Sequence, residues 1–112
     1  MPQDIALIKH DITDIEEENT LGISGGTVFH LAAFFANQNS VDHPELDLHT
    51  NGNGTLALLR WATATGAQKV VYASAGCSIA GHDTHGPIEE LEQATLHMDT
   101  PYQITIALGE FY

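Results

Sequence analysis

The chain has 112 residues, of which 43% are apolar, and this length and composition predict one folded domain with no room for a second. Its 15 acidic side chains against three lysines and arginines give a net charge of −12, which repels nucleic-acid phosphates and anionic lipids. Because no apolar run approaches the roughly 20 residues of a membrane span and the N-terminus lacks a signal-peptide pattern, we expect a cytoplasmic protein that binds neither nucleic acid nor membrane.

The first half of the chain predicts two strands. A short apolar run at Ile5–Ile8 ends in a polar turn at 11–14, which is the pattern of a buried strand. Residues 15–26 begin with acidic side chains and end in two glycines, so they predict a short helix or an irregular crossover. Residues 27–33 are nearly all apolar and predict a second strand in a sheet that is covered on both faces.

The second half predicts a long helix, a third strand and a final helix. From Pro44 onward an apolar stripe indicates a helix, in which Gly52 and Gly54 predict a bend or a close contact. Residues 69–74 are rich in β-branched side chains and predict a strand, and Thr100–Pro101 predict the start of the last helix. Strands that alternate with helices imply parallel pairing, so we expect an α/β fold with about three parallel strands and flanking helices.

Four motifs follow one another along the chain. They are Asp-Ile-Thr-Asp at 11–14, Val-Phe-His-Leu-Ala-Ala at 28–33, Asn-x-x-Gly-Thr-Leu at 51–56 and Val-Val-Tyr-Ala-Ser at 70–74, the last followed by Pro-Tyr and Gly-Glu-Phe-Tyr. This ordered set resembles the NAD-dependent epimerase/dehydratase family, the extended short-chain dehydrogenase/reductases. The resemblance implies a single partial Rossmann-like domain over residues 1–112, without the family's glycine-rich pyrophosphate loop or its C-terminal substrate domain.

The resemblance also implies the ligands and partners. These are NAD or NADP as the cofactor, a nucleotide sugar as the small-molecule partner, and a homodimer or other self-association. In family members, the helices equivalent to residues 44–65 and 101–112 form the dimer. A sheet that lacks neighbouring strands also exposes edges that are prone to association.

Two segments resemble cofactor contacts of the family. Asp11 and Ile12 look like the pair at the adenine ring, with Asp11 accepting a hydrogen bond from the adenine amino group. An aspartate beside a turn is also a common capping residue, which is the alternative interpretation. Leu31, Ala32 and Ala33 resemble the segment along the ribose and phosphate, where small side chains permit close backbone approach. They are also expected to form a buried strand end, and the two interpretations are compatible.

Two polar residues are expected to have structural roles. His30 lies on an apolar strand, which favours core packing with a backbone hydrogen bond over catalysis. Asn51 matches the family's asparagine in the central helix. We expect its amide to bond backbone groups at the helix irregularity.

The catalytic residues of the family are expected at the last strand and the last helix. Tyr102 resembles the tyrosine that acts as base while a hydride passes between a sugar carbon and nicotinamide. In the family a lysine one helical turn later favours the phenolate, but Ile106 stands at that position. We therefore expect impaired hydride transfer, or alternatively a non-catalytic module that binds a partner or nucleotide weakly. Ser74 and Ser78 compete for the serine that orients the substrate.

No metal site is expected. His82 and His85 are close in sequence, but zinc sites draw on tightly paired Cys and His ligands, so solvated loop histidines are favoured. Cys77 is the only cysteine and has no adjacent basic residue that would favour a reactive thiolate. It therefore predicts a small, partly buried side chain.

Overall fold

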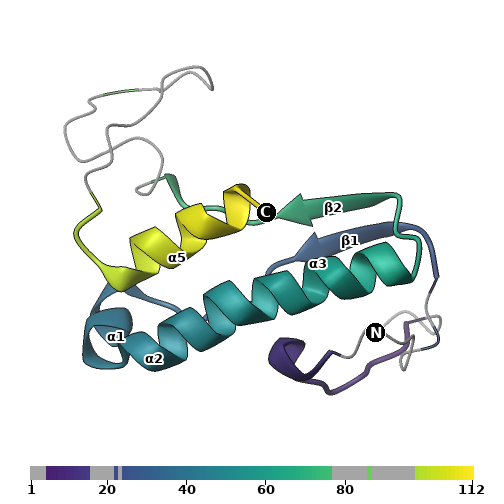
Figure 1. Cartoon of the computed structure of the whole chain (residues 1–112), viewed down its shortest axis with the longest axis horizontal. Coiled ribbons are helices and arrows are strands. Elements are labelled where there is room, and N and C mark those ends of the chain that lie inside the picture. Colours follow the sequence, from purple (N-terminus) through teal and green to yellow (C-terminus); the bar gives the residue numbers. More distant parts are fainter. Residues whose placement is uncertain (1–4, 16–21, 23, 77–85, 87–97) are drawn as a thin grey trace.

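The computed structural model of the chain describes residues 5–15, 22, 24–76, 86 and 98–112 (Figure 1). In chain order its elements are the 3₁₀ turn η1 Ile12–Asp14, β1 Thr27–His30, α1 Asn37–Asp42, α2 Pro44–Asp47, the π-helical η2 Leu48–Asn53, α3 Gly54–Ala64, β2 Lys69–Tyr72 and α5 Pro101–Glu110. The two strands pair in parallel, with Thr27 opposite Lys69 and His30 opposite Tyr72. The predicted α/β fold with parallel pairing is therefore confirmed.

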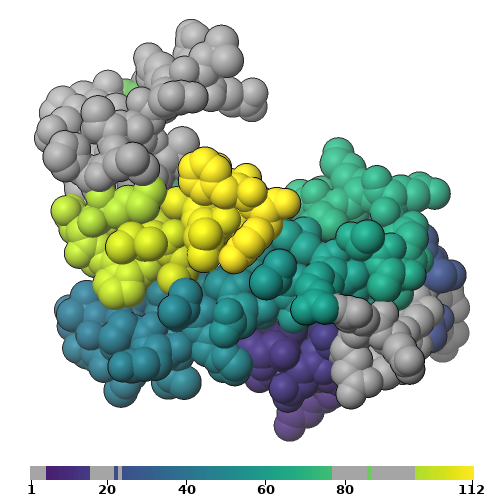
Figure 2. All heavy atoms as spheres, in the orientation of Figure 1, coloured from purple at the N-terminus to yellow at the C-terminus, as the bar shows by residue number. Residues whose placement is uncertain are grey.

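The helices form one connected layer. α2, η2 and α3 run on from one another as a single long rod, and α5 packs against η2, α1 and α2 (Figure 1). Figure 2 shows the atoms of α5 resting directly on those of α1 and α2. The buried apolar side chains come from α3 and α5, and they are Leu58, Trp61, Ala62, Ile106 and Ala107. No helix in the described ranges is long and apolar enough to cross a membrane.

The irregularity predicted within the long helix is confirmed at the two glycines. Gly52 lies in the π-helical segment η2, and Gly54 is the first residue of α3. A Cβ on Gly54 would lie 2.7 Å from the Cδ1 atom of Ile12. The glycine therefore leaves the space in which the side chain of Ile12, from the turn η1, rests on the helix.

The start of α5 is also confirmed. The Thr100 hydroxyl accepts a hydrogen bond from the Gln103 N–H at 3.3 Å, and Gln103 Oε1 accepts from the Thr100 N–H at 3.3 Å. Pro101 occupies the first turn, where its missing N–H costs nothing. This reciprocal capping satisfies two backbone donors that a helix start otherwise leaves open.

Three details differ from the prediction. Residues Ile5–Ile8 form no strand and are exposed, because no neighbouring strand in the described part pairs with them. The sheet therefore has two described strands where about three were expected, and both strands end earlier than predicted. α1 was not predicted, since its residues carry no apolar periodicity. Most of the segment 15–26 lies outside the described residues.

Candidate functional site

Asn51 connects three parts of the molecule through its buried side chain. Its Oδ1 atom accepts from the Phe34 N–H at 2.7 Å, and its Nδ2 atom lies 3.2 Å from the Phe34 carbonyl oxygen. Nδ2 also donates to Asp47 Oδ1 at 2.8 Å and lies 3.2 Å from Thr105 Oγ1. The expectation that the Asn51 amide bonds backbone groups is confirmed, but these groups belong to the segment that follows β1 and not to the irregular part of the helix.

Tyr102 lies half-buried in the first turn of α5. Its N–H donates to the Ser40 hydroxyl at 3.0 Å, so α1 supplies an acceptor for one of the open donors of the helix start. Its ring meets the ring of Phe35 edge to face, with centroids 5.7 Å apart and planes at 85°. Phe35 follows β1, so the phenol lies on the carboxyl side of the parallel strands, where α/β sheets bind ligands.

Ile106 stands one helical turn after Tyr102 and is a core residue, with 3% of its surface exposed. Its carbonyl oxygen accepts a hydrogen bond from the Tyr72 hydroxyl at 3.0 Å, which ties α5 to β2. The isoleucine carries no charge, and its side chain is one of the buried apolar set of α3 and α5. The cation expected from a family lysine is replaced here by core packing.

Ser74 and Tyr102 lie at opposite ends of α5. The Ser74 hydroxyl donates to Oε1 of Glu110, the last residue of that helix. At about 1.5 Å per residue, Glu110 lies about 12 Å along the helix axis from Tyr102. The structure therefore does not bring the Ser74 hydroxyl and Tyr102 together, and the competing Ser78 lies outside the described residues.

Asp11 has the capping geometry that was the alternative interpretation. Its Oδ1 atom accepts from the Thr13 N–H at 2.9 Å and from the Thr13 hydroxyl at 2.8 Å. These hydrogen bonds, the backbone one first, lower the pKa of the Asp11 carboxyl. Asp11 is exposed, so capping leaves its carboxylate open to solvent, while the neighbouring Ile12 rests on Gly54. Contact with an adenine ring stays a prediction.

Leu31, Ala32 and Ala33 directly follow β1 and are all exposed. The expectation of a buried strand end is therefore wrong, because β1 ends at His30 and no described residue covers these three. Two of the three side chains are single methyl groups. An open backbone with small side chains at the carboxyl end of a strand fits the approach of a dinucleotide.

His30 is a core residue, as predicted, with 3% of its surface exposed. Its Nε2 atom lies 2.8 Å from the Thr55 hydroxyl, so its partner is a side chain on α3 instead of the expected backbone group. The His30 ring also contacts Tyr72, with centroids 5.3 Å apart. Burial lowers the pKa of His30, whereas burial, with Glu110 and Tyr102 nearby, raises the pKa of Tyr72.

Three residues of the site were missed by the sequence reasoning. They are Asp47, Tyr72 and Thr105, and each has a polar group whose partner lies in another element. One signal was present, because Asp47 precedes Asn51 by one helical turn and residues so spaced lie side by side. The link from this pair to Thr105 depends on how the two helices pack and has no local signature.

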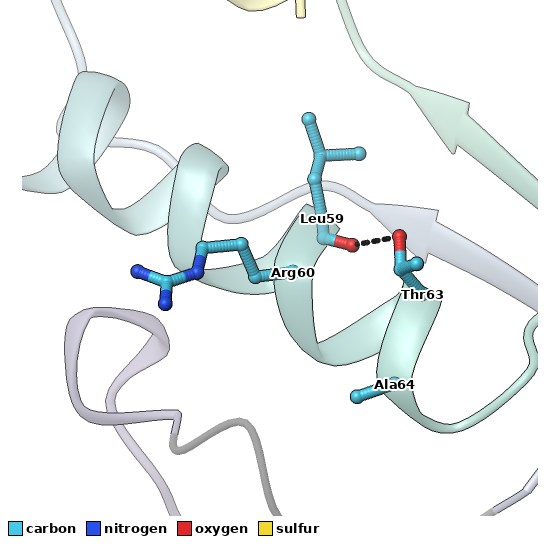
Figure 3. A pocket seen from close by; sticks show the side chains of 4 residues that line it. All are labelled: Leu59, Arg60, Thr63 and Ala64. Carbon is cyan, nitrogen blue, oxygen red and sulfur yellow. Dashed lines mark hydrogen bonds between the residues drawn. The ribbon is translucent and has the colours of Figure 1, made fainter.

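A pocket of about 370 Å³ lies elsewhere, on α3, and opens widely to solvent. Leu59, Arg60, Thr63 and Ala64 line it, and Figure 3 shows the Thr63 hydroxyl donating to the Leu59 carbonyl, a bond of 2.9 Å. None of the predicted site residues lines this pocket. Among the described ranges no three His, Cys, Asp or Glu side chains gather as metal ligands, and Cys77, His82 and His85 lie outside those ranges.

Comparisons with known proteins find relatives of the chain in both sequence and structure. UDP-glucose 4-epimerase of Mycolicibacterium smegmatis is 33% identical over 106 residues, which cover 94% of this chain and 33% of that protein. The epimerase Mth375 of Methanothermobacter thermautotrophicus is 51% identical with a TM-score of 0.70, and the match covers 77% of this chain and 25% of that one. The enzyme WbmF of Bordetella bronchiseptica, solved in complex with NAD+, is 30% identical with a TM-score of 0.61, over 92% and 28% of the two chains.

The matched region is a third or less of each of these relatives. Within this chain the match is nearly complete, because residues 1–111 correspond to the NAD dependent epimerase/dehydratase family. The resemblance carried by the four motifs is thereby confirmed. The chain belongs to the NAD dependent epimerase/dehydratase family.

Proposed function

We propose that this chain forms part of a cytoplasmic nucleotide-sugar epimerase or dehydratase that uses NAD or NADP, with Tyr102 in the position of the base. The observation that carries the proposal is the placement of Tyr102 in the first turn of α5, on the carboxyl side of the strands and against Phe35. The names of the relatives support the substrate class, since one is a UDP-glucose 4-epimerase. The NAD+ complex of WbmF supports the cofactor.

The proposed roles follow from the positions of the side chains. Asp11 and Ile12 would hold the adenine end of the cofactor, and Leu31, Ala32 and Ala33 would line its ribose and phosphate. When bound, the nicotinamide supplies a hydride acceptor for a sugar carbon. Tyr102 would take the proton of the sugar hydroxyl, and either Ser74 or Ser78 would orient that hydroxyl; the bond from Ser74 to Glu110 favours Ser78.

Hydride transfer in this chain is proposed to be impaired. A lysine near a phenol favours the charged phenolate, and it also anchors the cofactor in the family; an isoleucine can do neither. The burial of Ile106, at 3% exposed, favours a second candidate function. In that case the chain is a non-catalytic module of the same origin, which binds a nucleotide or a partner weakly.

A titration with NAD and NADP, followed by calorimetry or fluorescence, distinguishes the two candidates. We expect a dissociation constant below about 100 μM, equivalent to about 5.5 kcal/mol of binding free energy, for a chain that retains the cofactor site. Ala32→Asp places a carboxylate beside the proposed phosphate path and should weaken binding by about tenfold, or about 1.4 kcal/mol.

The matched control is Ala64→Asp, because Ala64 is also an exposed alanine and lines the pocket on α3. This control should leave the dissociation constant unchanged. Absence of binding by the unsubstituted chain would contradict the enzyme proposal and favour the non-catalytic module. Equal losses in the two variants would reject the assigned cofactor segment.

A further inference from the structure

Asp47, at the end of α2, is a carboxylate with no exposed surface, at 0%. Both of its oxygens are engaged, because Oδ1 accepts from Asn51 Nδ2 at 2.8 Å and Oδ2 accepts from the Thr105 hydroxyl at 2.8 Å. Fully buried carboxylates are rare in proteins unless they are paired or hydrogen-bonded. This one joins the irregular part of the long helix to α5, the helix that carries Tyr102.

The Thr105 hydroxyl has a choice between two acceptors. It lies 2.8 Å from Asp47 Oδ2 and 3.2 Å from the carbonyl oxygen of Tyr102, three residues earlier in the same helix. A hydroxyl has one proton, and a carboxylate at the shorter distance is the stronger acceptor. The Thr105 hydroxyl therefore favours Asp47 over the Tyr102 carbonyl. A hydrogen bond from a Ser or Thr hydroxyl to an earlier carbonyl of the same helix often bends the helix. In α5 that bend would fall in the turn that holds Tyr102.

We propose that Asp47 and Thr105 are positioning residues for Tyr102, in which the carboxylate holds the Thr105 hydroxyl and so fixes the direction of the first turn of α5. Ser40, with 0% of its surface exposed, holds the same turn from α1 through the Tyr102 N–H. The inference rests on the proposed role of Tyr102 as the base position. The position of the Tyr102 ring can be measured in the protein without ligand, because the ring contacts Phe35 there.

The test uses nuclear Overhauser contacts between the rings of Tyr102 and Phe35, recorded without nucleotide. Thr105→Val keeps the side-chain shape but removes the hydroxyl. Asp47→Asn replaces one carboxylate oxygen by an NH2 group, so one of the two donors that Asp47 holds loses its acceptor. Both variants should lose the ring contact, while Thr105→Ser, which keeps the hydroxyl, should retain it. The matched control is Thr63→Val, because the hydroxyl of Thr63, an exposed residue of α3, donates to the Leu59 carbonyl in the same helix.

A purely structural role would lower the melting temperature of Thr105→Val and leave the contact between Tyr102 and Phe35 as strong as in Thr63→Val; that outcome overturns the proposal. If Thr105→Val does not fold, Asp47→Asn and Thr105→Ser decide. Loss of the contact in the first together with retention in the second supports the proposal, and any other pattern rejects it. Because the rings are observed without ligand, a failure to bind NAD affects the proposed function alone.

Discussion

Burial of a titratable ring gives His30 a measurable effect on stability. The pKa of His30 is lowered from its ordinary value of 6.5, so the folded protein favours the neutral ring. The stability that comes from burying the neutral His30 ring is fully present above pH 6.5. It is lost as the pH falls from 6.5 through the lower pKa of the folded protein. We therefore expect the melting temperature to fall on acidification, and to fall less steeply in His30→Gln, which does not titrate.

The control for this pH effect is His43→Gln, because His43 is exposed. Thermal unfolding followed by circular dichroism across the acidic range should give this variant the same slope as the unsubstituted chain. An equal change of slope in the two variants would show that burial of His30 is not the cause.

Replacing Ile106 by lysine is expected to destabilise this chain but to restore activity in a chimera. In this chain Ile106→Lys places an ammonium group in the core, which should lower the free energy of unfolding by about 3 kcal/mol, compared with less than about 1.5 kcal/mol for Ile106→Leu. Denaturant titration measures both values. A lysine variant as stable as the leucine variant would show that position 106 can reach solvent.

In a chimera that carries the family's glycine-rich loop, Ile106→Lys should instead restore turnover. The reason is that the lysine would then supply the charge that favours the Tyr102 phenolate. Turnover of a nucleotide sugar is the measurement, with the unsubstituted chimera as the reference. No gain over that reference would reject Tyr102 as the base.

At the level of elements, α5 approaches β2 closely at one glycine. A Cβ on Gly109 would overlap the ring of Tyr72, and that ring cannot easily move because its hydroxyl is bonded to the Ile106 carbonyl. We expect Gly109→Ala to lower the free energy of unfolding by about 1 to 3 kcal/mol, the range for overpacked sites. Gly76→Ala is the control, since a Cβ there meets nothing within 4 Å. Similar denaturation midpoints for the two variants would contradict this account.

Elements with a local cause could be predicted, and those with a tertiary cause could not. Thr100–Pro101 contain their own helix start, and Gly52 and Gly54 reveal the irregular helix, because capping and backbone freedom act over a few residues. The apolar run at Ile5–Ile8 reads as a strand, but a strand also needs a neighbour that no local pattern specifies. The separation of Ser74 from Tyr102 likewise follows from the hydrogen bond to Glu110, which is distant in sequence.

For the whole molecule, exposed apolar side chains predict self-association. Phe29 on the sheet and Ile104 on α5 are 65% and 52% exposed. We propose that a homodimer forms through the helices, so Ile104→Asp should weaken association while Phe29→Asp, the matched change on the sheet, should not. Light scattering against protein concentration measures this, and added salt should favour the dimer by screening the net charge of −12. A monodisperse monomer at all concentrations contradicts the proposal.

The hydrogen bonds between Asn51 and Phe34 have a further consequence for the backbone after β1. Its side-chain amide accepts from the N–H and lies within bonding distance of the C=O of one residue, which are the same two groups that a neighbouring backbone would engage. The amide thus mimics a peptide unit and engages the backbone four residues beyond the end of β1. Asparagine suits this role because aspartate offers only the acceptor and leucine offers neither group. The direction of the segment that leads to Phe35 is therefore set by a side chain of the long helix, in the way that a neighbouring strand would set it.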